Sequence, residues 1–182
     1  MIESDALSLP PQAAAEAAGF LRAGGAGEEA LIGALTQSAA ELCERFTGLV
    51  LLARGFAQTL RPDGAWQRLG RTPVRAISGI EAVPPAGAPE ALPAAAYALD
   101  IDAQGDGWVR IADPAAARRV RISYQAGIAV EWDGVPAALR HGVTRLAAHL
   151  YSLRGGEAGE LRSEPPAAVT ALWRPYRRLR LV

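Results

Sequence analysis

The sequence predicts an α+β fold: two long packed helices form a helical body, a β-rich insertion of hairpins lies between them, and an extended or helical tail closes the chain. Three observations predict this class. Apolar residues recur at steps of three or four over residues 28–46 and again over 136–154, which is typical of helices that bury one face. Between them, residues 49–125 contain short β-prone runs separated by Gly, Pro and Asp. We therefore expect a single domain over residues 1–164 and a C-terminal tail over 165–182.

The first two helices are separated by a glycine-rich turn. Pro10 and Pro11 open a short alanine-rich helix that we expect to run to about residue 22. The second helix spans 28–46, and Gly48 supplies its stop. Its expected buried face consists of Leu31, Leu35, Ala39, Leu42 and Phe46.

The third predicted helix, over residues 136–154, has the clearest apolar pattern. Its seam is formed by Leu139, Val143, Leu146, Leu150 and Leu153. These residues step by four and three, as in a heptad, so we expect this helix to pack on the second one.

The β-rich insertion is punctuated by turn residues. We expect strands at residues 49–60, 73–83 and 120–127 and a hairpin over 97–111. In the last strand, Arg119 and Arg121 alternate with Val120 and Ile122, which predicts one wet and one buried face.

Composition excludes several classes of protein. The 182 residues carry 19 basic and 19 acidic side chains, so no global field draws the chain to nucleic acid or to an anionic membrane. Every basic residue is an arginine, which rules out a lysine Schiff base and a Walker-type phosphate loop. The single cysteine, Cys43, permits no intrachain disulfide and is expected to be a small buried hydrophobe.

We expect a soluble protein made without a secretion signal. The acidic start of the chain lacks a basic region of the kind that opens a signal peptide. No apolar run approaches the roughly 20 residues that a membrane span requires.

The acidic run in the predicted hairpin resembles a calcium loop only in part. Asp100, Asp102 and Asp106 match the spacing of the first half of an EF-hand, but Ile111 stands where the bidentate Glu belongs, and strands flank the segment where helices should be. We interpret it as an acidic hairpin turn and expect no metal and no cofactor.

The third helix carries a polar stripe formed by Arg140, His141, Arg145 and His149. Two imidazoles eight residues apart, with an arginine midway, do not make a metal site. No G-x-S-x-G elbow or comparable nucleophile occurs either, so we expect no enzyme activity. The stripe is expected to be solvated or to face a partner.

The tail combines aromatic and basic side chains. Its candidate contact residues are Leu172, Trp173, Arg174, Tyr176, Arg177 and Arg178. Trp, Tyr and Arg are enriched where proteins meet, which favours a protein interface. The same residues would also suit a nucleic-acid strand or a contact within the chain, and Pro175 predicts that any helix here is interrupted.

Several segments, in this order, resemble the head-tail connector proteins of tailed phages. They are E-L-C-E-R-F-T-G at 41–48, R-T-P-V-R-A-I-S-G-I at 71–80, Y-Q-A-G at 124–127, V-P at 135–136 leading to A-A-H-L-Y at 147–151, and L-W-R-P-Y-R-R at 172–178. The resemblance covers residues 28–180. The Ala- and Arg-rich composition resembles the version found in phage-like gene transfer agents of high-GC bacteria.

The resemblance implies a structural virion protein that is assembled in the bacterial cytoplasm. About a dozen copies would form a ring below the portal protein, joining the DNA-filled head to the tail. The ring would contact the next tail or stopper protein and continue the DNA channel without specific DNA binding and without a membrane. The tail residues named above would dock into the portal, and the stripe on the third helix would face either the channel or a neighbouring copy.

Three other functions remain open at this stage. A nucleic-acid-binding module would use the Arg and aromatic residues of the tail and would bind DNA with a steep salt dependence. A tail-side stopper or completion protein would also form a ring at the same junction. A small hydrolase would need a concave site with convergent ionisable groups, and two histidines and one cysteine offer few of them.

Overall fold

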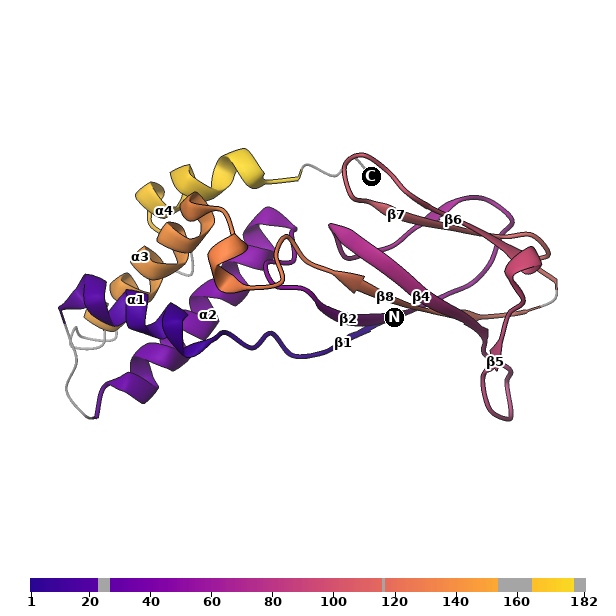
Figure 1. Cartoon of the computed structure of the whole chain (residues 1–182), viewed down its shortest axis with the longest axis horizontal. Helices are drawn as coiled ribbons and strands as arrows, with labels where there is room; N and C mark the ends of the chain where they lie inside the picture. The colour runs from indigo at the N-terminus through magenta and orange to yellow at the C-terminus, as the bar shows by residue number, and fades with distance from the viewer. Residues whose placement is uncertain (23–26, 116, 154–164, 179–182) are drawn as a thin grey trace. The chain divides into compact units, whose positions relative to one another are not determined.

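The computed structural model describes residues 1–22, 27–115, 117–153 and 165–178, and these fold as two compact units. The β unit comprises Met1–Ala6 and Leu52–Ile128, and the helical unit comprises Leu7–Leu51 and Ala129–Val182. Helices gather in one unit and strands in the other (Figure 1). The predicted α+β class is confirmed, and strands β2 to β8 lie between the two long helices in the chain, whereas β1 precedes them.

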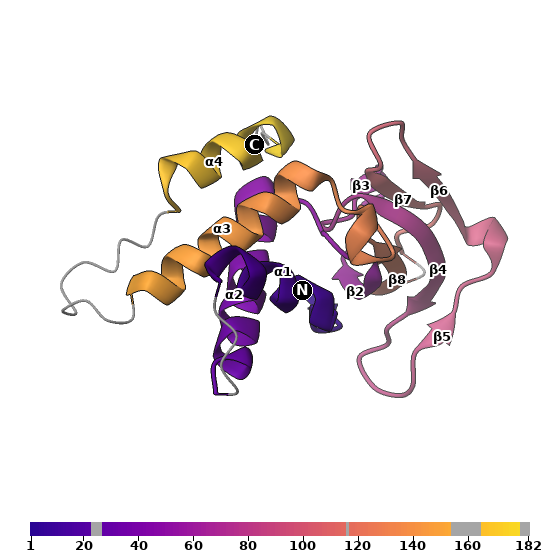
Figure 2. The ribbon, with the colours of Figure 1, turned by 60° about the vertical axis from the view of Figure 1, so that its left-hand side comes forward.

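The helical unit contains the three predicted helices and a fourth. They are α1 (Pro11–Leu21), α2 (Glu29–Thr47), α3 (Ala137–Leu153) and α4 (Ala167–Trp173), with short 3-10 turns η2 (Trp132–Gly134) and η3 (Arg174–Tyr176). Each predicted helix agrees with the structure to within about one residue at either end. Helices α2 and α3 pack on each other as expected, and α1 and α4 each contact both (Figure 2).

The buried face of α2 differs from the predicted one. It is formed by Ile32, Thr36, Ala39, Ala40, Cys43 and Thr47. Of the expected face only Ala39 is fully buried; the large residues lie beside the buried face, because Leu31 is 39% exposed and Leu35, Leu42 and Phe46 are half-buried. Small side chains at the centre let neighbouring helices approach α2 closely, and the larger ones pack along its flanks. The helix ends as predicted, at Gly48 in the left-handed conformation with φ 74°.

The apolar seam of α3 is confirmed over its first half. Leu139, Val143 and Leu146 are buried, whereas Leu150 is half-buried and Leu153 is 40% exposed. The seam therefore leaves the interior as α3 approaches its C-terminal end.

The β unit contains two antiparallel sheets and a 3-10 turn, η1 (Ala94–Ala96). The first has the order β1 (Ile2–Ser4), β2 (Arg54–Leu60), β8 (Val120–Ala126), β4 (Val74–Ala82), β5 (Glu90–Ala91). The second has the order β3 (Gln67–Arg68), β7 (Gly107–Ile111), β6 (Tyr97–Ile101). The strands predicted at 73–83 and 120–127 and the hairpin over 97–111 are confirmed.

Two parts of the strand prediction were wrong. The strand expected over residues 49–60 begins only at Arg54, and residues 49–52 form a buried connection that precedes it. The N-terminal strand β1 was not predicted. It pairs with β2, and its Glu3 carboxylate forms an ion pair with Arg121 of β8 at 3.0 Å.

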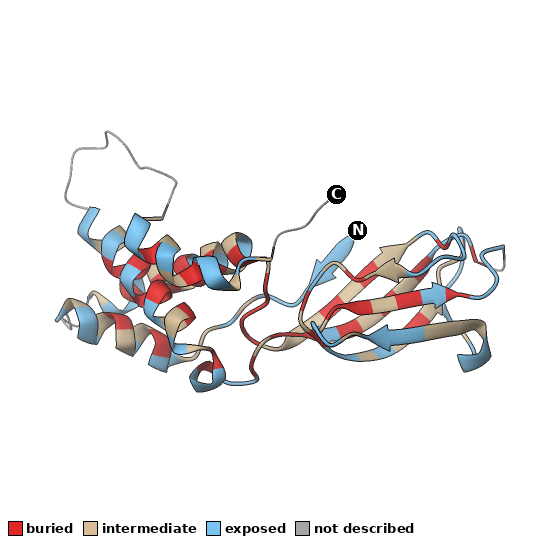
Figure 3. Ribbon diagram, turned by 90° about the horizontal axis from the view of Figure 1, so that it is seen from above, coloured by how far each residue is buried: buried red, intermediate tan, exposed pale blue. Residues whose placement is uncertain are grey.

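Along the strands of the β unit, the buried residues that form its core alternate with more exposed residues (Figure 3). Phe56 and Tyr124 stack in this core with their ring centroids 5.6 Å apart. The Tyr124 hydroxyl donates a hydrogen bond to Gln58 Oε1 at 3.3 Å. Burial raises the pKa of Tyr124, so its phenol remains a neutral donor.

Candidate functional site

The C-terminal segment folds as a short helix followed by a tighter turn. Helix α4 begins after Pro166 and ends at Trp173, and Pro175 lies within the 3-10 turn η3. The prediction that Pro175 interrupts the helix is confirmed, because proline has no amide hydrogen for the α-helical ladder.

Trp173 is fully buried in the helical unit. Its ring centroid lies 5.8 Å from that of Phe46 on α2, and its Nε1 donates a hydrogen bond to the Leu139 carbonyl of α3 at 3.3 Å. One side chain therefore joins α4 to both long helices. Of the three alternatives that the sequence left open for the tail, Trp173 makes the contact within the chain.

The close approach of Trp173 to α3 depends on Gly142. A Cβ atom at position 142 would overlap the indole Nε1 and lie 2.8 Å from the indole Cδ1 and Cε2 atoms. Glycine in mid-helix normally costs about 1 kcal/mol relative to alanine. Its presence here is explained by the space that the indole occupies.

The residues after Trp173 lie over the C-terminal end of α2. The Arg177 guanidinium stands 5.5 Å from the Phe46 ring centroid, and the Arg178 amide donates to the Thr47 carbonyl at 3.0 Å. Arg174 and Arg177 are exposed, whereas Leu172, Tyr176 and Arg178 are half-buried. The segment thus presents two arginines outward from a base that Trp173 fixes.

In this arrangement Trp173 offers no surface to a partner, so a contact between its ring and the portal would require α4 to leave the helical unit. The roles predicted for Leu172, Arg174, Tyr176, Arg177 and Arg178 as partner contacts stay predictions. The structure brings these residues together in one segment, as the sequence indicated.

The stripe on α3 divides into two parts. His141, Arg145 and His149 are exposed on one side of the helix. Arg140 is half-buried and forms ion pairs at 3.1 Å with Glu16 of α1 and with Asp133. Arg140 therefore helps hold the helical unit together. The contact with a channel or a neighbouring copy stays a prediction for the three exposed residues, of which His141 also meets the Phe20 ring edge-on at 6.4 Å.

The acidic segment of the β6–β7 hairpin is an internally bonded turn. Asp102 Oδ1 accepts hydrogen bonds from the amides of Gln104 and Asp106, and its Oδ2 accepts one from Trp108 Nε1 at 3.0 Å. Asp106 forms an ion pair with Arg68. These contacts support the hairpin-turn interpretation, and no metal-ligating cluster occurs among the described residues.

Cys43 is a structural residue, as predicted. It is buried in α2, and burial, followed by the charge of Glu44, raises the pKa of its thiol well above the ordinary range. A protonated buried thiol is a poor nucleophile and a poor metal ligand.

Sequence reasoning missed a pocket in the β unit. It is lined by Arg61, Arg118 and Arg119 together with proline rings. The available signal was an arginine doublet and an Arg-Pro step placed directly beside strand ends. These two segments lie far apart in the chain, so the sequence does not show that they line one pocket.

Comparison with known proteins relates the whole chain to particle components. No family model matches the sequence, and no curated protein matches it either. Among solved structures, the chain is similar to one in the neck of an empty gene transfer agent particle computed with C6 symmetry, with a TM-score of 0.78 and 28% identity. The alignment covers 100% of this chain and 97% of that one. The chain has the fold of a gene transfer agent neck protein.

A second similar chain comes from the virion of a native gene transfer agent particle, with a TM-score of 0.76, 26% identity and coverage of 100% and 97%. A third, from the neck of a native particle computed with C12 symmetry, has a TM-score of 0.73 and 24% identity over 100% and 97% of the two chains, and supports the fold alone. The resemblance to connector proteins of gene transfer agents is thereby confirmed. The similarity also includes residues 1–27, which the sequence motifs did not cover.

Among the described residues, no helix is both long and apolar enough to cross a bilayer.

Proposed function

We propose that the chain is a head–tail adaptor of a phage-like particle: a structural protein that forms a ring below the portal, joins the DNA-filled head to the tail and continues the DNA channel. The observation that carries this proposal is the correspondence over the full length with a chain in a gene transfer agent neck. The alignment covers 100% of this chain and 97% of that one.

A ring is supported by the sixfold and twelvefold symmetry with which two of the similar neck structures were computed. In a ring of identical copies, each copy uses two different surfaces, one toward each neighbour. The exposed part of the α3 stripe, His141, Arg145 and His149, is a candidate for one of these surfaces or for the channel wall.

We assign portal contact to the exposed residues of the C-terminal segment. Arg174 and Arg177 point outward, and Tyr176 is half-buried between them. Trp173 acts beneath them by fixing α4 on α2 and α3. The alternative of a nucleic-acid module loses support, because the Trp173 ring is buried and so cannot stack on bases.

The first experiment mixes the purified chain with the portal ring of the same genome and measures mass by light scattering. We expect the adaptor to add about one copy per portal subunit, as a shared ring symmetry requires. Absence of any association with a folded chain would contradict the adaptor proposal and favour a tail-side ring protein.

The C-terminal contact is tested with a variant that keeps the core intact. Deletion of residues 167–182 is unsuitable because it removes buried Trp173. R174A/R177A changes only exposed side chains, and R71A/R75A on the β unit removes the same charge. We expect portal association to be lost in the first variant and kept in the second. Equal binding by both would contradict the assignment of the portal contact.

A further inference from the structure

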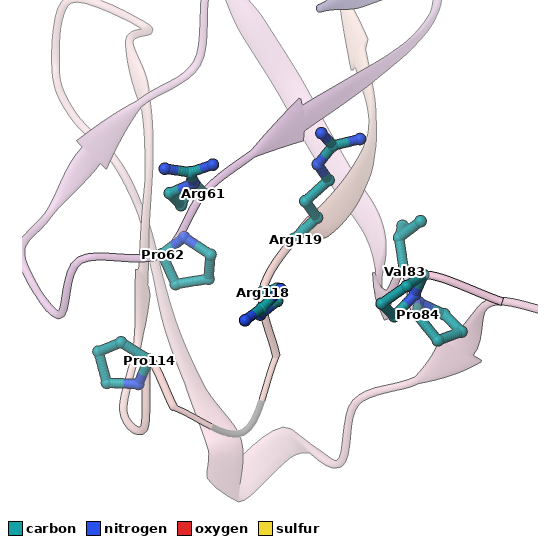
Figure 4. A pocket seen from close by; sticks show the side chains of 8 residues that line it. Arg61, Pro62, Val83, Pro84, Pro114, Arg118 and Arg119 are labelled. Atoms are coloured by element: carbon teal, nitrogen blue, oxygen red, sulfur yellow. The ribbon is translucent and has the colours of Figure 1, made fainter.

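The β unit carries an open hollow of about 720 Å³ beside the ends of its strands. Its lining consists of Arg61, Pro62, Val83, Pro84, Pro85, Pro114, Arg118 and Arg119. In Figure 4, Arg118 lies between Pro62 and Pro114 on one side and Val83 and Pro84 on the other. Arg61 and Arg119 also line the hollow. Hollows of this size hold small ligands or a few residues of a peptide.

The strand register explains why these distant residues meet. Leu60 at the end of β2 and Ala82 at the end of β4 both pair with Val120 at the start of β8. Arg61 and Pro62 follow the first strand, Val83 and Pro84 follow the second, and Arg118 and Arg119 precede the third. The prolines end the ladders at this edge, because their nitrogens donate no hydrogen bond.

The charge of the hollow is not neutralised within the unit. Arg61, Arg118 and Arg119 are exposed and make no ion pair with any residue that the structure describes. By contrast, Arg68 and Arg121 of the same unit are paired with Asp106 and Glu3. Like charges gathered without a counter-charge repel one another, and a bound anion removes that cost.

The chemistry of the walls favours carboxylates on a peptide. Guanidinium groups bind carboxylates through paired N–H donors, and proline rings add apolar surface that strengthens such pairs by excluding water. Pro84 and Pro85 offer flat faces on which an extended chain can lie. Glu90 of β5, which lines an adjoining hollow with Arg118, bounds the positive region on that side.

Duplex DNA fits the hollow less well. Its phosphates lie on a convex surface with one charge per roughly 1.7 Å of helix axis, and binding them requires cations spread along a face. The β unit contains as many acidic residues as arginines, so it carries no net positive charge to attract a phosphate backbone. The three arginines instead line one concave place.

We propose that the hollow lined by Arg61, Arg118 and Arg119 docks an acidic peptide segment of a neighbouring protein in the neck. This proposal rests on the adaptor function for its partner and concerns a surface that the portal contact does not use. It assigns to the β unit a second docking point, specific for carboxylate side chains.

The test uses a fluorescein-labelled hexaglutamate peptide and fluorescence anisotropy on the whole chain at low ionic strength. R61Q/R118Q/R119Q removes the hollow's charge, and R71Q/R75Q/R110Q removes the same charge from exposed positions elsewhere on the β unit. We expect the first variant to weaken peptide binding about tenfold or more and the second to bind like the parent. Thermal unfolding followed by circular dichroism establishes that both variants are folded.

Equal weakening in both variants, or none in either, would overturn the proposal. A labelled 24-base-pair duplex, a second probe, would overturn it in favour of phosphate if it bound more tightly than the peptide and lost affinity only in the first variant. Light scattering with the portal ring separates the two proposals. If portal association persists while the peptide fails to bind the hollow, the adaptor function stands and the acidic-peptide site does not.

Discussion

The two units use their tryptophans in opposite ways. In the helical unit, Trp132 and Trp173 are 2% and 0% exposed. In the β unit, Trp108 is half-buried, and Trp66 is 43% exposed with the Arg110 guanidinium 5.3 Å from its ring centroid. Leu99 and Ile101 on the edge strand β6 are also 40% and 41% exposed.

The helical unit and the β unit therefore offer different kinds of surface to a partner. The helical unit is rich in alanine, and buried tryptophans fill the space that small side chains leave. The β unit keeps apolar residues and unpaired arginines on its surface, and exposed apolar groups together with arginine are typical of surfaces that meet partners. Both units therefore offer contacts: the helical unit through exposed side chains around an enclosed core, and the β unit through an exposed tryptophan and the arginine-lined hollow.

The largest difference in stability is expected between substitutions of Trp173 and Trp66. W173A should lower the free energy of unfolding by about 3–5 kcal/mol, because it empties a fully enclosed site between α2, α3 and α4. W66A should lower it by no more than about 1 kcal/mol, the usual size of an exposed cation–π contact. Urea unfolding measures both.

Hydrogen–deuterium exchange then locates the effect. In W173A, faster exchange should appear in α2 and α3, whereas the strands should exchange as in the parent. A similar loss of stability in W66A and W173A would remove the distinction between the units.

Two glycine substitutions test the close packing of the helical unit with opposite expected signs. G142A should destabilise the protein by about 1–3 kcal/mol, because its methyl group would overlap the Trp173 indole. G33A on α2 has no atom within 4 Å of its new Cβ and should stabilise by about 0.5–1 kcal/mol through helix propensity. Thermal unfolding of the pair checks this, and stabilisation by G142A would show that α4 is not held against α3.

The buried thiol predicts a pH dependence confined to the helical unit. Burial raises the pKa of Cys43 in the folded chain, so the folded state keeps its proton when the unfolded thiol, with a pKa of about 8.5, ionises. Stability from this group is complete below that pH and falls above it by up to about 1.4 kcal/mol per pH unit. Urea unfolding between pH 7 and 10 should therefore show a steeper loss in the parent than in C43A. Parallel curves would contradict an enclosed thiol.

The smallest expected effect belongs to the exposed apolar edge of the β unit. L99T/I101T should change the free energy of unfolding by less than about 0.5 kcal/mol per site, since both side chains already face solvent in part and β-branched threonine suits a strand. Chemical denaturation measures this. A loss above about 2 kcal/mol would mean that β6 belongs to the core of its unit.

The sequence predicted what local pattern determines. Helical periodicity located α1, α2 and α3, and alternation located β4, β8 and the β6–β7 hairpin. The candidate tail residues were correctly grouped, because they are contiguous. The buried position of Trp173 was not favoured, since an aromatic residue among arginines looks the same whether its ring meets a partner or the chain itself.

The remaining features depend on contacts between distant segments. β1 is three residues long and has no buried residue, so its sequence contains no strand pattern. It forms because β2 offers an edge with which it can pair. The apolar run at residues 49–52 reads as a strand, but it is a buried connection. The arginine-lined hollow arises from a register in which two strand ends meet the start of a third.

The division of each unit between separate parts of the chain has a consequence for synthesis on the ribosome. Helices α1 and α2 emerge early, but their partners α3 and α4 are made only after every strand of the β unit. At roughly 5–20 residues per second, α2 waits several seconds before α3 and α4 can cover the part of its apolar face that α1 leaves open. Because Trp173 follows every strand in the chain, the helical unit can close around it only after the whole β unit has been made.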